Sequence, residues 1–214
     1  SDRIEMMQNN IDPSDELEES DFKDCDIFFT SNIEDLKDVK FFIVAVPTPI
    51  DENRKPNINP LLSASKTVGN VLKRGDYVVY ESTVYPGVTA QTWHPIIEEL
   101  GLVIGDDVEI AYCPERFNPG DSAHGVRQVA RVIGCSNPEV GKALVSLYSK
   151  LTTEDVRYVG KLEVAEAAKV IENVQRDINI ALVNELARIF PALDVDVEDV
   201  LSAAATKWNF HRYT

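Results

Sequence analysis

Three short segments combine side chains that could bind or transform a small polar molecule with prolines that stiffen the backbone. They are Val46-Pro47-Thr48-Pro49, the run Glu81–Gly87 with Ser82 and Thr83, and the run Cys113–Asp121 with Glu115, Arg116 and Asn118. The second segment ends in a Pro-Gly turn before a predicted helix, and the free N–H groups of a helix N-terminus suit a phosphate or a carboxamide. Each segment alone is typical of an ordinary turn or a surface ion pair. Three of them at strand ends of one sheet favour a ligand cleft.

A pair of polar residues on a long predicted helix is a further candidate. Lys169 and Asn173 are four residues apart and share a helical face, which continues through Arg176 or Asp177 to Asn184. The surrounding residues are small or apolar: Ala165, Ala168, Ile171, Val174 and Ile178. This pattern predicts a packed helix on which an ammonium and a carboxamide stabilise an anion. The alternative is a solvated polar stripe.

The histidines and cysteines show no catalytic or metal-binding spacing. His94 is expected to be structural, His211 belongs to no triad, and His124 could touch a ligand from the loop after Glu115. The three cysteines, Cys25, Cys113 and Cys135, form no CxxC motif and no disulfide framework, which suits a reducing cytosol. Cys113 is interpreted as a small buried thiol.

Alternating strands and helices must position these residues. Apolar runs predict strands, and capping residues, proline and glycine delimit helices between them. The expected strands are 41–47, 77–80, 108–112, 131–134 and 156–159, and the expected helices are 59–74, 88–100 and 136–151. This order predicts an α/β fold with a parallel sheet and helices on both faces, and each polar segment follows a strand.

After Gly160 the pattern changes to helix only. Residues 162–190 contain no glycine or proline and predict a helix of about 43 Å at 1.5 Å per residue. A shorter helix is expected over 197–205. We therefore expect one α/β domain over 1–160 and the start of a helical domain over 161–214. A helix this long is typical of a link between domains or of an oligomer core, which predicts a homodimer through 162–190.

Charge excludes some partners. The formal net charge is -15, and residues 1–40 contribute -9 of it. Nucleic acid and anionic membranes need a cationic face, so neither is an expected partner. No apolar run reaches the length of a membrane span and no signal peptide begins the chain, so we expect a cytoplasmic protein. The acidic run 12–21 predicts a solvated loop or a frayed helix.

Together these segments resemble the nucleotide-sugar 6-dehydrogenases, the family of UDP-glucose and GDP-mannose dehydrogenases. The resemblance rests on VAVPTPIDENRKPN at 44–57, VVYESTVYPG at 78–87, YCPERFNPGD at 112–121 and VAEAAKVIENVQRDINIALVNELA at 164–187. The tail Ala205–Phe210 looks like the family's approach to its substrate loop. The run Pro114–Gly120 is similar to the UDP-N-acetylhexosamine branch, whereas the glucose branch has Pro-Glu-Phe-Leu-Arg-Glu there.

This resemblance implies oxidation of a sugar C6 alcohol to a carboxylate in two hydride transfers to NAD, in bacterial surface-polysaccharide synthesis. The cofactor positions it implies are Arg3, Pro47, Thr48, Ser82, Thr83 and Glu115. Substrate contacts are implied for Glu115, Arg116, Asn118, Lys169 and Asn173. Catalytic roles are implied for Lys169, Asn173, Thr83 and Glu115, the first two through stabilisation of oxyanions.

The sequence departs from the family pattern in two ways. None of the ten glycines forms a GxGxxG turn, and no cysteine follows the Trp208–Phe210 segment. The sequence is thus expected to be an internal part of a longer enzyme that lacks the first strand, turn and helix, and to be inactive alone. Two other interpretations stay open: a non-catalytic dimerisation module, and a relative of the β-hydroxyacid dehydrogenases.

Overall fold

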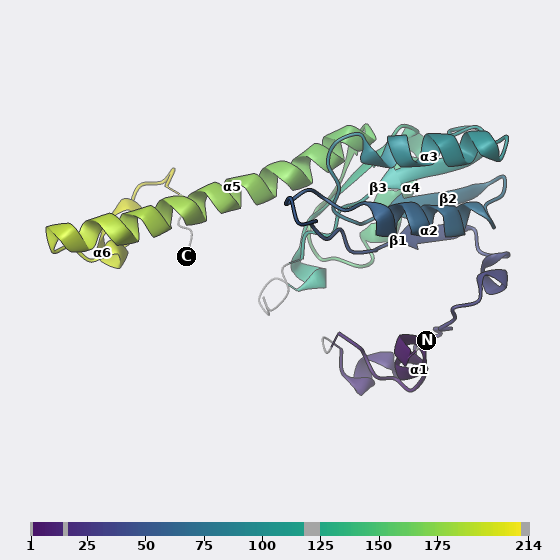
Figure 1. Cartoon of the computed structure of the whole chain (residues 1–214), viewed down its shortest axis with the longest axis horizontal. Helices are drawn as coiled ribbons and strands as arrows, with labels where there is room; N and C mark the ends of the chain where they lie inside the picture. Colours follow the sequence, from purple (N-terminus) through teal and green to yellow (C-terminus); the bar gives the residue numbers. More distant parts are fainter. Residues whose placement is uncertain (1, 15–16, 118–124, 211–214) are drawn as a thin grey trace. The chain divides into compact units, whose positions relative to one another are not determined.

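The computed structural model of the chain describes residues 2–14, 17–117 and 125–210 (Figure 1). Its helices are α1 (Asp2–Gln8), α2 (Asn59–Gly69), α3 (Val88–Glu99), α4 (Pro138–Tyr148), α5 (Leu162–Ile189) and α6 (Val197–Ala204). Its strands are β1 (Phe41–Val44), β2 (Asp76–Tyr80), β3 (Val108–Tyr112), β4 (Arg131–Cys135) and β5 (Val156–Gly160). Short 3-10 turns cover Glu19–Phe22, Ile33–Leu36, Val126–Gln128 and Phe190–Leu193. The α/β fold class is confirmed.

The strands form one sheet in the order β1-β2-β3-β4-β5. β4 and β5 are parallel, with Arg131 opposite Val156. β4 is antiparallel to β3, with Ala111 opposite Cys135. The expectation of a parallel sheet is therefore wrong for the pair β3–β4. A run of apolar residues indicates that a strand is buried and does not indicate its direction.

The chain divides into two compact units. Unit 1 comprises Ser1–Val79 and Thr92–Ile110, and unit 2 comprises Tyr80–Gln91 and Ala111–Thr214. This division cuts through β2 and β3 and does not follow the expected boundary at residue 160. The helical residues after 160 belong to unit 2 because the first turns of α5 lie on β4 and β5.

In unit 1, β1 is shorter than expected and ends at Val44. Phe42 and Val44 are buried whereas Ile43 is 51% exposed, so β1 has one buried face and not two. This alternation fits the edge position of the strand. α2 begins at Asn59 with a proline in its first turn, as expected, and ends at Gly69, before the expected Arg74.

The amino-terminal part of unit 1 contains little regular structure. In the acidic run 12–21, Asp12 and Pro13 are half-buried and the other described residues are exposed. The described part of the run forms no helix before Glu19, which agrees with the solvated interpretation. α1, over Asp2–Gln8, was not expected from the sequence. Gln8 Nε2 donates a hydrogen bond to Phe29 O (2.9 Å) and connects α1 to the segment before Ile33–Leu36.

In unit 2, two glycines allow helices to approach the strands closely. A Cβ on Gly134 of β4 would lie 2.8 Å from Lys161 O, just before α5 begins. A Cβ on Gly141 of α4 would lie 2.4 Å from the ring of Tyr158 on β5. No side chain fits at either contact, so α4 and α5 lie directly on β4 and β5.

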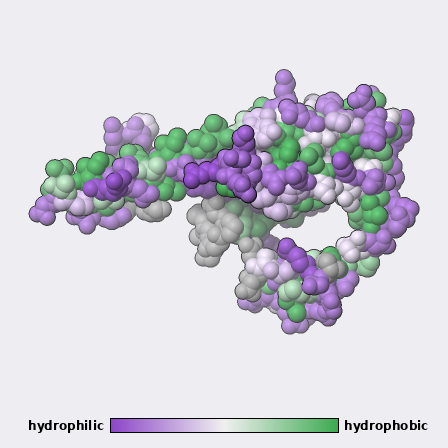
Figure 2. Space-filling view, in the orientation of Figure 1, coloured by the Kyte–Doolittle hydropathy of each residue, from purple (hydrophilic) through white to green (hydrophobic). Residues whose placement is uncertain are grey.

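α5 has 28 residues and extends well beyond the strands that its first turns contact (Figure 1). Its buried residues are Leu162, Ala165, Glu166 and Lys169, all near its beginning. Farther along, apolar side chains are exposed, and hydrophobic residues follow the helix in Figure 2. The most exposed of them share one face: Ile171 (64%), Ile178 (61%), Leu182 (52%) and Ile189 (53%).

Candidate active site

The carboxyl ends of β2 and β3 bring two of the predicted segments together within unit 2. Cys113 N donates to Tyr80 O (2.8 Å) and Glu115 N donates to Glu81 O (3.2 Å). The connection Glu81–Gly87 therefore lies beside the residues that follow β3. In it, Ser82 is buried and Thr83 is exposed.

Glu115 is held by its own backbone neighbours. Its Oε1 accepts hydrogen bonds from Arg116 N and Phe117 N, both at 2.7 Å, and its Oε2 lies 3.4 Å from Arg131 Nη2. Arg131 is 4% exposed, and its guanidinium lies 5.6 Å from the centre of the Tyr148 ring. The carboxylate thus has a fixed orientation at the end of β3.

Behind Glu115 lies a group of buried titratable side chains. Tyr148 Oη donates to Glu81 Oε1 (2.6 Å). Burial raises the pKa of Glu81 above its ordinary value, and the nearby Glu115 adds to the increase, whereas Tyr148 and Arg131 oppose it. Burial also raises the pKa of Cys113 to about 12. The expected buried thiol is confirmed, and at neutral pH it is a poor nucleophile.

Lys169 and Asn173 lie in the first half of α5. Lys169 is 9% exposed, and burial lowers its pKa, with Glu172 opposing this effect and Arg176 adding to it. Glu115 and Arg116 also act electrostatically on the ammonium group, and Arg116 bonds to Glu172, three residues further along α5 than Lys169. Among the described residues no hydrogen bond or salt bridge to Lys169 is found. Asn173 is half-buried, and its Oδ1 accepts a hydrogen bond from Arg176 Nη2 (3.0 Å).

The packed face expected around these two residues is only partly present. Ala165 is buried, but Ile171, Val174 and Ile178 are exposed. The polar face that was expected to reach Asn184 is exposed from Arg176 onward. The sequence pattern was misleading because the sheet covers only the first turns of α5.

Arg116 has protein partners for most of its guanidinium. Its Nε and Nη2 lie 3.0 Å and 2.7 Å from the two carboxylate oxygens of Glu172, and its Nη1 donates to Ala130 O (2.7 Å). Two parallel bonds from one guanidinium to one carboxylate fix the relative orientation of both groups. This pair connects the residues after β3 to α5.

Sequence reasoning missed Glu166. This residue of α5 is fully buried, and its carboxylate accepts hydrogen bonds from Gly87 N (2.6 Å), Thr89 N (3.0 Å) and Thr89 Oγ1 (2.6 Å). The N–H groups at the beginning of α3 were expected to be free for a ligand. The structure corrects this, since Glu166 occupies them. One sequence feature could have indicated this role: Glu166 lies on the same helical face as the apolar residues Leu162 and Ala165.

The remaining cofactor candidates lie in unit 1. Thr48 Oγ1 is buried and has no hydrogen-bond partner among the described residues. An orphaned hydroxyl of this kind fits a hydrogen bond to a bound cofactor. Pro47 beside it is exposed. Arg3 is exposed on α1, whereas its expected place was directly after a strand.

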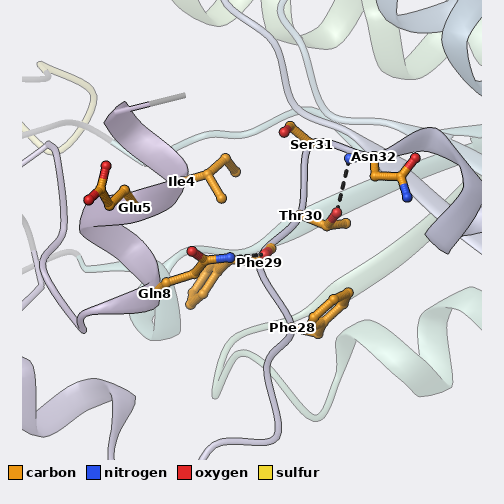
Figure 3. Close-up of a pocket in the computed structure, with 8 residues that line it drawn as sticks. All are labelled: Ile4, Glu5, Gln8, Phe28, Phe29, Thr30, Ser31 and Asn32. Atoms are coloured by element: carbon orange, nitrogen blue, oxygen red, sulfur yellow. Dashed lines mark hydrogen bonds between the residues drawn. The ribbon is translucent and has the colours of Figure 1, made fainter.

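A pocket of about 480 Å³ lies between α1 and the segment Phe28–Asn32 (Figure 3). Its lining contains Ile4, Glu5 and Gln8 from α1, and Gln8 bonds across it to Phe29 O. None of the predicted site residues lines this pocket. It therefore adds nothing to the candidate site.

The other candidates are surface residues or lie outside the described residues. Asn118 and His124 belong to 118–124, which the structure does not describe, and His211 also falls outside it. His94, which was expected to be structural, is exposed on α3. Within 2–14, 17–117 and 125–210, no group of three His, Cys, Asp or Glu is placed to hold a metal ion. No helix in those ranges is long and apolar enough to cross a membrane.

An α/β sheet with polar residues at its strand ends, followed by a long helix that carries a buried lysine, fits the class of Rossmann-like dinucleotide-binding proteins. Residues 3–152 match the NAD binding domain of the UDP-glucose/GDP-mannose dehydrogenase family, and residues 163–214 match the central domain of that family. The chain belongs to this family. NAD is confirmed as the cofactor of the matched domain. Membership decides against the β-hydroxyacid dehydrogenase alternative.

The chain is similar to several relatives and solved structures of this family, some of which are named for N-acetylhexosamine substrates. The chain is 50% identical over 209 residues to protein CapL of Staphylococcus aureus, covering 97% of this chain and 49% of that protein. It is 47% identical over 210 residues to UDP-N-acetyl-D-glucosamine 6-dehydrogenase of Pseudomonas aeruginosa, covering 97% and 50%. The structure of UDP-D-ManNAc dehydrogenase from Pyrococcus horikoshii superposes with a TM-score of 0.79 at 32% identity, covering 86% and 44%. The chain spans about half the length of the curated relatives it matches.

Proposed function

We propose that the intact protein containing this chain oxidises the C6 hydroxyl of a UDP-N-acetylhexosamine to the uronic acid, for surface-polysaccharide biosynthesis. The observation that carries the proposal is the buried Lys169, within electrostatic reach of Glu115 and Arg116 in the Pro-Glu-Arg-Phe segment. The similarity to a UDP-N-acetyl-D-glucosamine 6-dehydrogenase over 97% of the chain supports the substrate class.

The reaction removes two hydrides from C6, consumes one water molecule and releases protons. NAD⁺ supplies the hydride acceptor when bound. Among the residues of this chain, Lys169 and Asn173 would donate hydrogen bonds to the oxygen on which negative charge develops. Thr83 and Glu115 would orient the reacting groups from the ends of β2 and β3. Asn118 stays a proposed substrate contact.

On the cofactor side, we propose that Thr48, Pro47, Ser82 and Arg3 contribute to NAD binding together with Thr83 and Glu115. The unpartnered Thr48 hydroxyl supports this most directly. Arg116, given its bonds to Glu172 and Ala130, is proposed to hold its segment against α5 and to act on the substrate indirectly.

The experiment is a measurement of NADH formation by the intact protein with UDP-N-acetylglucosamine, its galacto and manno epimers, and UDP-glucose. We expect two NADH per sugar with at least one N-acetylhexosamine and a much lower kcat/KM with UDP-glucose. Absence of NADH with all four sugars would contradict the proposed function. A preference for UDP-glucose would contradict the substrate class.

We also propose a cytoplasmic homodimer that associates through α5, and domains over 1–160 and 161–214. The matched ranges 3–152 and 163–214 support the boundary. The exposed apolar face of α5 supports association, because a face of this kind needs a partner surface. It also favours the second candidate function, a dimerisation module, which would associate without oxidising any sugar.

Light scattering tests the association. We expect a dimer for the parent chain and a monomer for the Ile171→Glu/Ile178→Glu double variant, because two carboxylates on this face oppose burial. Asn184→Glu adds a carboxylate to a different, exposed face of the same helix and should stay dimeric. A monomeric parent at tens of micromolar would contradict the proposed dimer.

A further inference from the structure

Glu166 is a buried carboxylate with an unusual set of partners. It is 0% exposed, at the beginning of α5, and the partners found for it are the neutral donors of Gly87 and Thr89. An ionised carboxylate is costly to bury unless hydrogen bonds compensate for the lost water. Here both oxygens are engaged, Oε2 by Gly87 N and Oε1 by the backbone and hydroxyl of Thr89. These three hydrogen bonds compensate for the water that the carboxylate loses on burial.

The position of this carboxylate is also favourable electrostatically. α3 begins at Val88, so Gly87 N and Thr89 N belong to the first N–H groups of the helix, which have no partner within it. The N-terminal end of a helix carries a partial positive charge that favours an anion. Glu166 therefore caps α3 from another helix, 77 residues further along the chain than Thr89.

The cap fixes the connection that precedes α3. Glu81–Gly87 is bounded by β2, which belongs to the sheet, and by Gly87, which Glu166 holds. Gly87 has φ +94, a conformation that other residues rarely adopt, so the chain turns there into α3. With both ends fixed, Thr83 in the middle of the connection has a restricted position.

The same helical face carries Glu166 and Lys169, three residues apart and both buried. We propose that Glu166 is a positioning residue that holds the Glu81–Gly87 connection, with Thr83, at a fixed place relative to Lys169. This proposal rests on the proposed function, because the proposed function places Thr83 and Lys169 in the reacting site. Without the carboxylate, the connection would move relative to α5 while the rest of the sheet stayed folded.

The first test needs no activity. Amide hydrogen exchange of the 214-residue chain should become about tenfold to a hundredfold faster at Gly87 and Thr89 in Glu166→Gln, because charge-assisted bonds are lost. The amide of Cys113, which bonds to Tyr80 O in the sheet, should keep its parent rate. Unchanged exchange at Gly87 and Thr89 would overturn the proposal.

The second test separates positioning from stability in the intact enzyme. Thr89→Val removes one donor to Glu166 and keeps the side-chain shape, whereas Thr89→Ser keeps the donor and is the matched control. We expect kcat to fall about tenfold in Thr89→Val, with KM for the UDP-sugar within threefold, and parent values in Thr89→Ser. A Thr89→Val enzyme with parent kcat would overturn the proposal.

The two tests also separate this proposal from the proposed function. If the parent enzyme oxidises no UDP-sugar, the proposed function fails, and the exchange rates at Gly87 and Thr89 alone decide whether Glu166 holds the connection. If Glu166→Gln does not fold, exchange in Thr89→Val is compared with that in Thr89→Ser. Equal rates in those two variants would overturn the proposal.

Discussion

The guanidinium of Arg116 meets the carboxylate of Glu172 along two N–O contacts, at 3.0 Å and 2.7 Å. Both side chains are partly exposed, at 24% and 35%. A double-mutant cycle with Arg116→Lys and Glu172→Gln should give a coupling of about 1 kcal/mol in the free energy of unfolding, since solvent screens part of the attraction. Chemical denaturation of the four chains measures it. No coupling, with KM for the UDP-sugar raised by Arg116→Lys alone, would instead indicate a direct substrate contact.

Lys169→Ala should act on turnover. If the ammonium stabilises charge that exists only in the transition state, its loss lowers kcat far more than it raises KM. Removal of one such donor typically costs roughly 10²–10³ in rate, about 3–4 kcal/mol. Steady-state kinetics of the intact enzyme test this. A kcat within threefold of the parent, with only KM changed, would make Lys169 a binding residue.

The lowered pKa of Lys169 predicts the alkaline side of the pH profile. The ammonium loses its proton at a lower pH than an ordinary lysine, whose pKa is 10.5, so kcat should fall before that pH is reached. Lys169→Arg keeps a positive charge over the whole range. Its kcat, although reduced, should not show this alkaline decrease. The same decrease in both enzymes would assign it to another group.

The raised pKa of Glu81 predicts an effect of pH on stability. Between its ordinary value of 4.5 and the raised value, the folded chain binds more protons than the unfolded chain. The free energy of unfolding therefore decreases as pH rises through this window. Glu81→Gln keeps an acceptor for Tyr148 Oη and removes the titration. We expect it to equal the parent below the window and to be more stable above it, which denaturation at several pH values measures.

Thiol labelling tests the burial of the cysteines. Cys25 is exposed, whereas Cys113 and Cys135 are both 0% exposed, and the pKa of Cys113 is raised to about 12. A thiol reagent at mildly alkaline pH should therefore modify one of the three cysteines in the folded chain and all three in denaturant. Cys25→Ser serves as the control and should not react while folded. Rapid labelling of Cys113 would contradict the buried site.

The regular elements could be predicted wherever local patterns decide them. The apolar run 108–112 is β3 to the residue, and the long helix expected over 162–190 is α5 over Leu162–Ile189. Asn137 caps α4 through a hydrogen bond from Glu139 N, as a capping residue before a proline indicates. The helix over Asp2–Gln8 was missed because its sequence lacks the apolar periodicity that marks a buried face.

The site could be predicted only in part. The predicted roles of Thr83, Glu115 and Lys169 rest on short motifs that can be recognised locally, and they stay predictions. Glu166 was missed because its partner Thr89 is 77 residues away, and no spacing rule relates them. The bond between Arg116 and Glu172 was missed for the same reason, at a separation of 56 residues.

Because β4 is antiparallel to β3, the ion pair between Arg131 and Glu115 does not depend on how many residues connect the two strands. Continuing the register in which Tyr112 faces Gly134 places Arg131, the first residue of β4, opposite Glu115, where the two side chains meet. In a parallel arrangement the first residue of β4 would lie at the other edge of the sheet. Strand pairing with β3 and β5, and not the number of residues between Phe117 and Gly125, sets the place of Arg131. Insertions or deletions between Phe117 and Gly125 should therefore leave this ion pair intact.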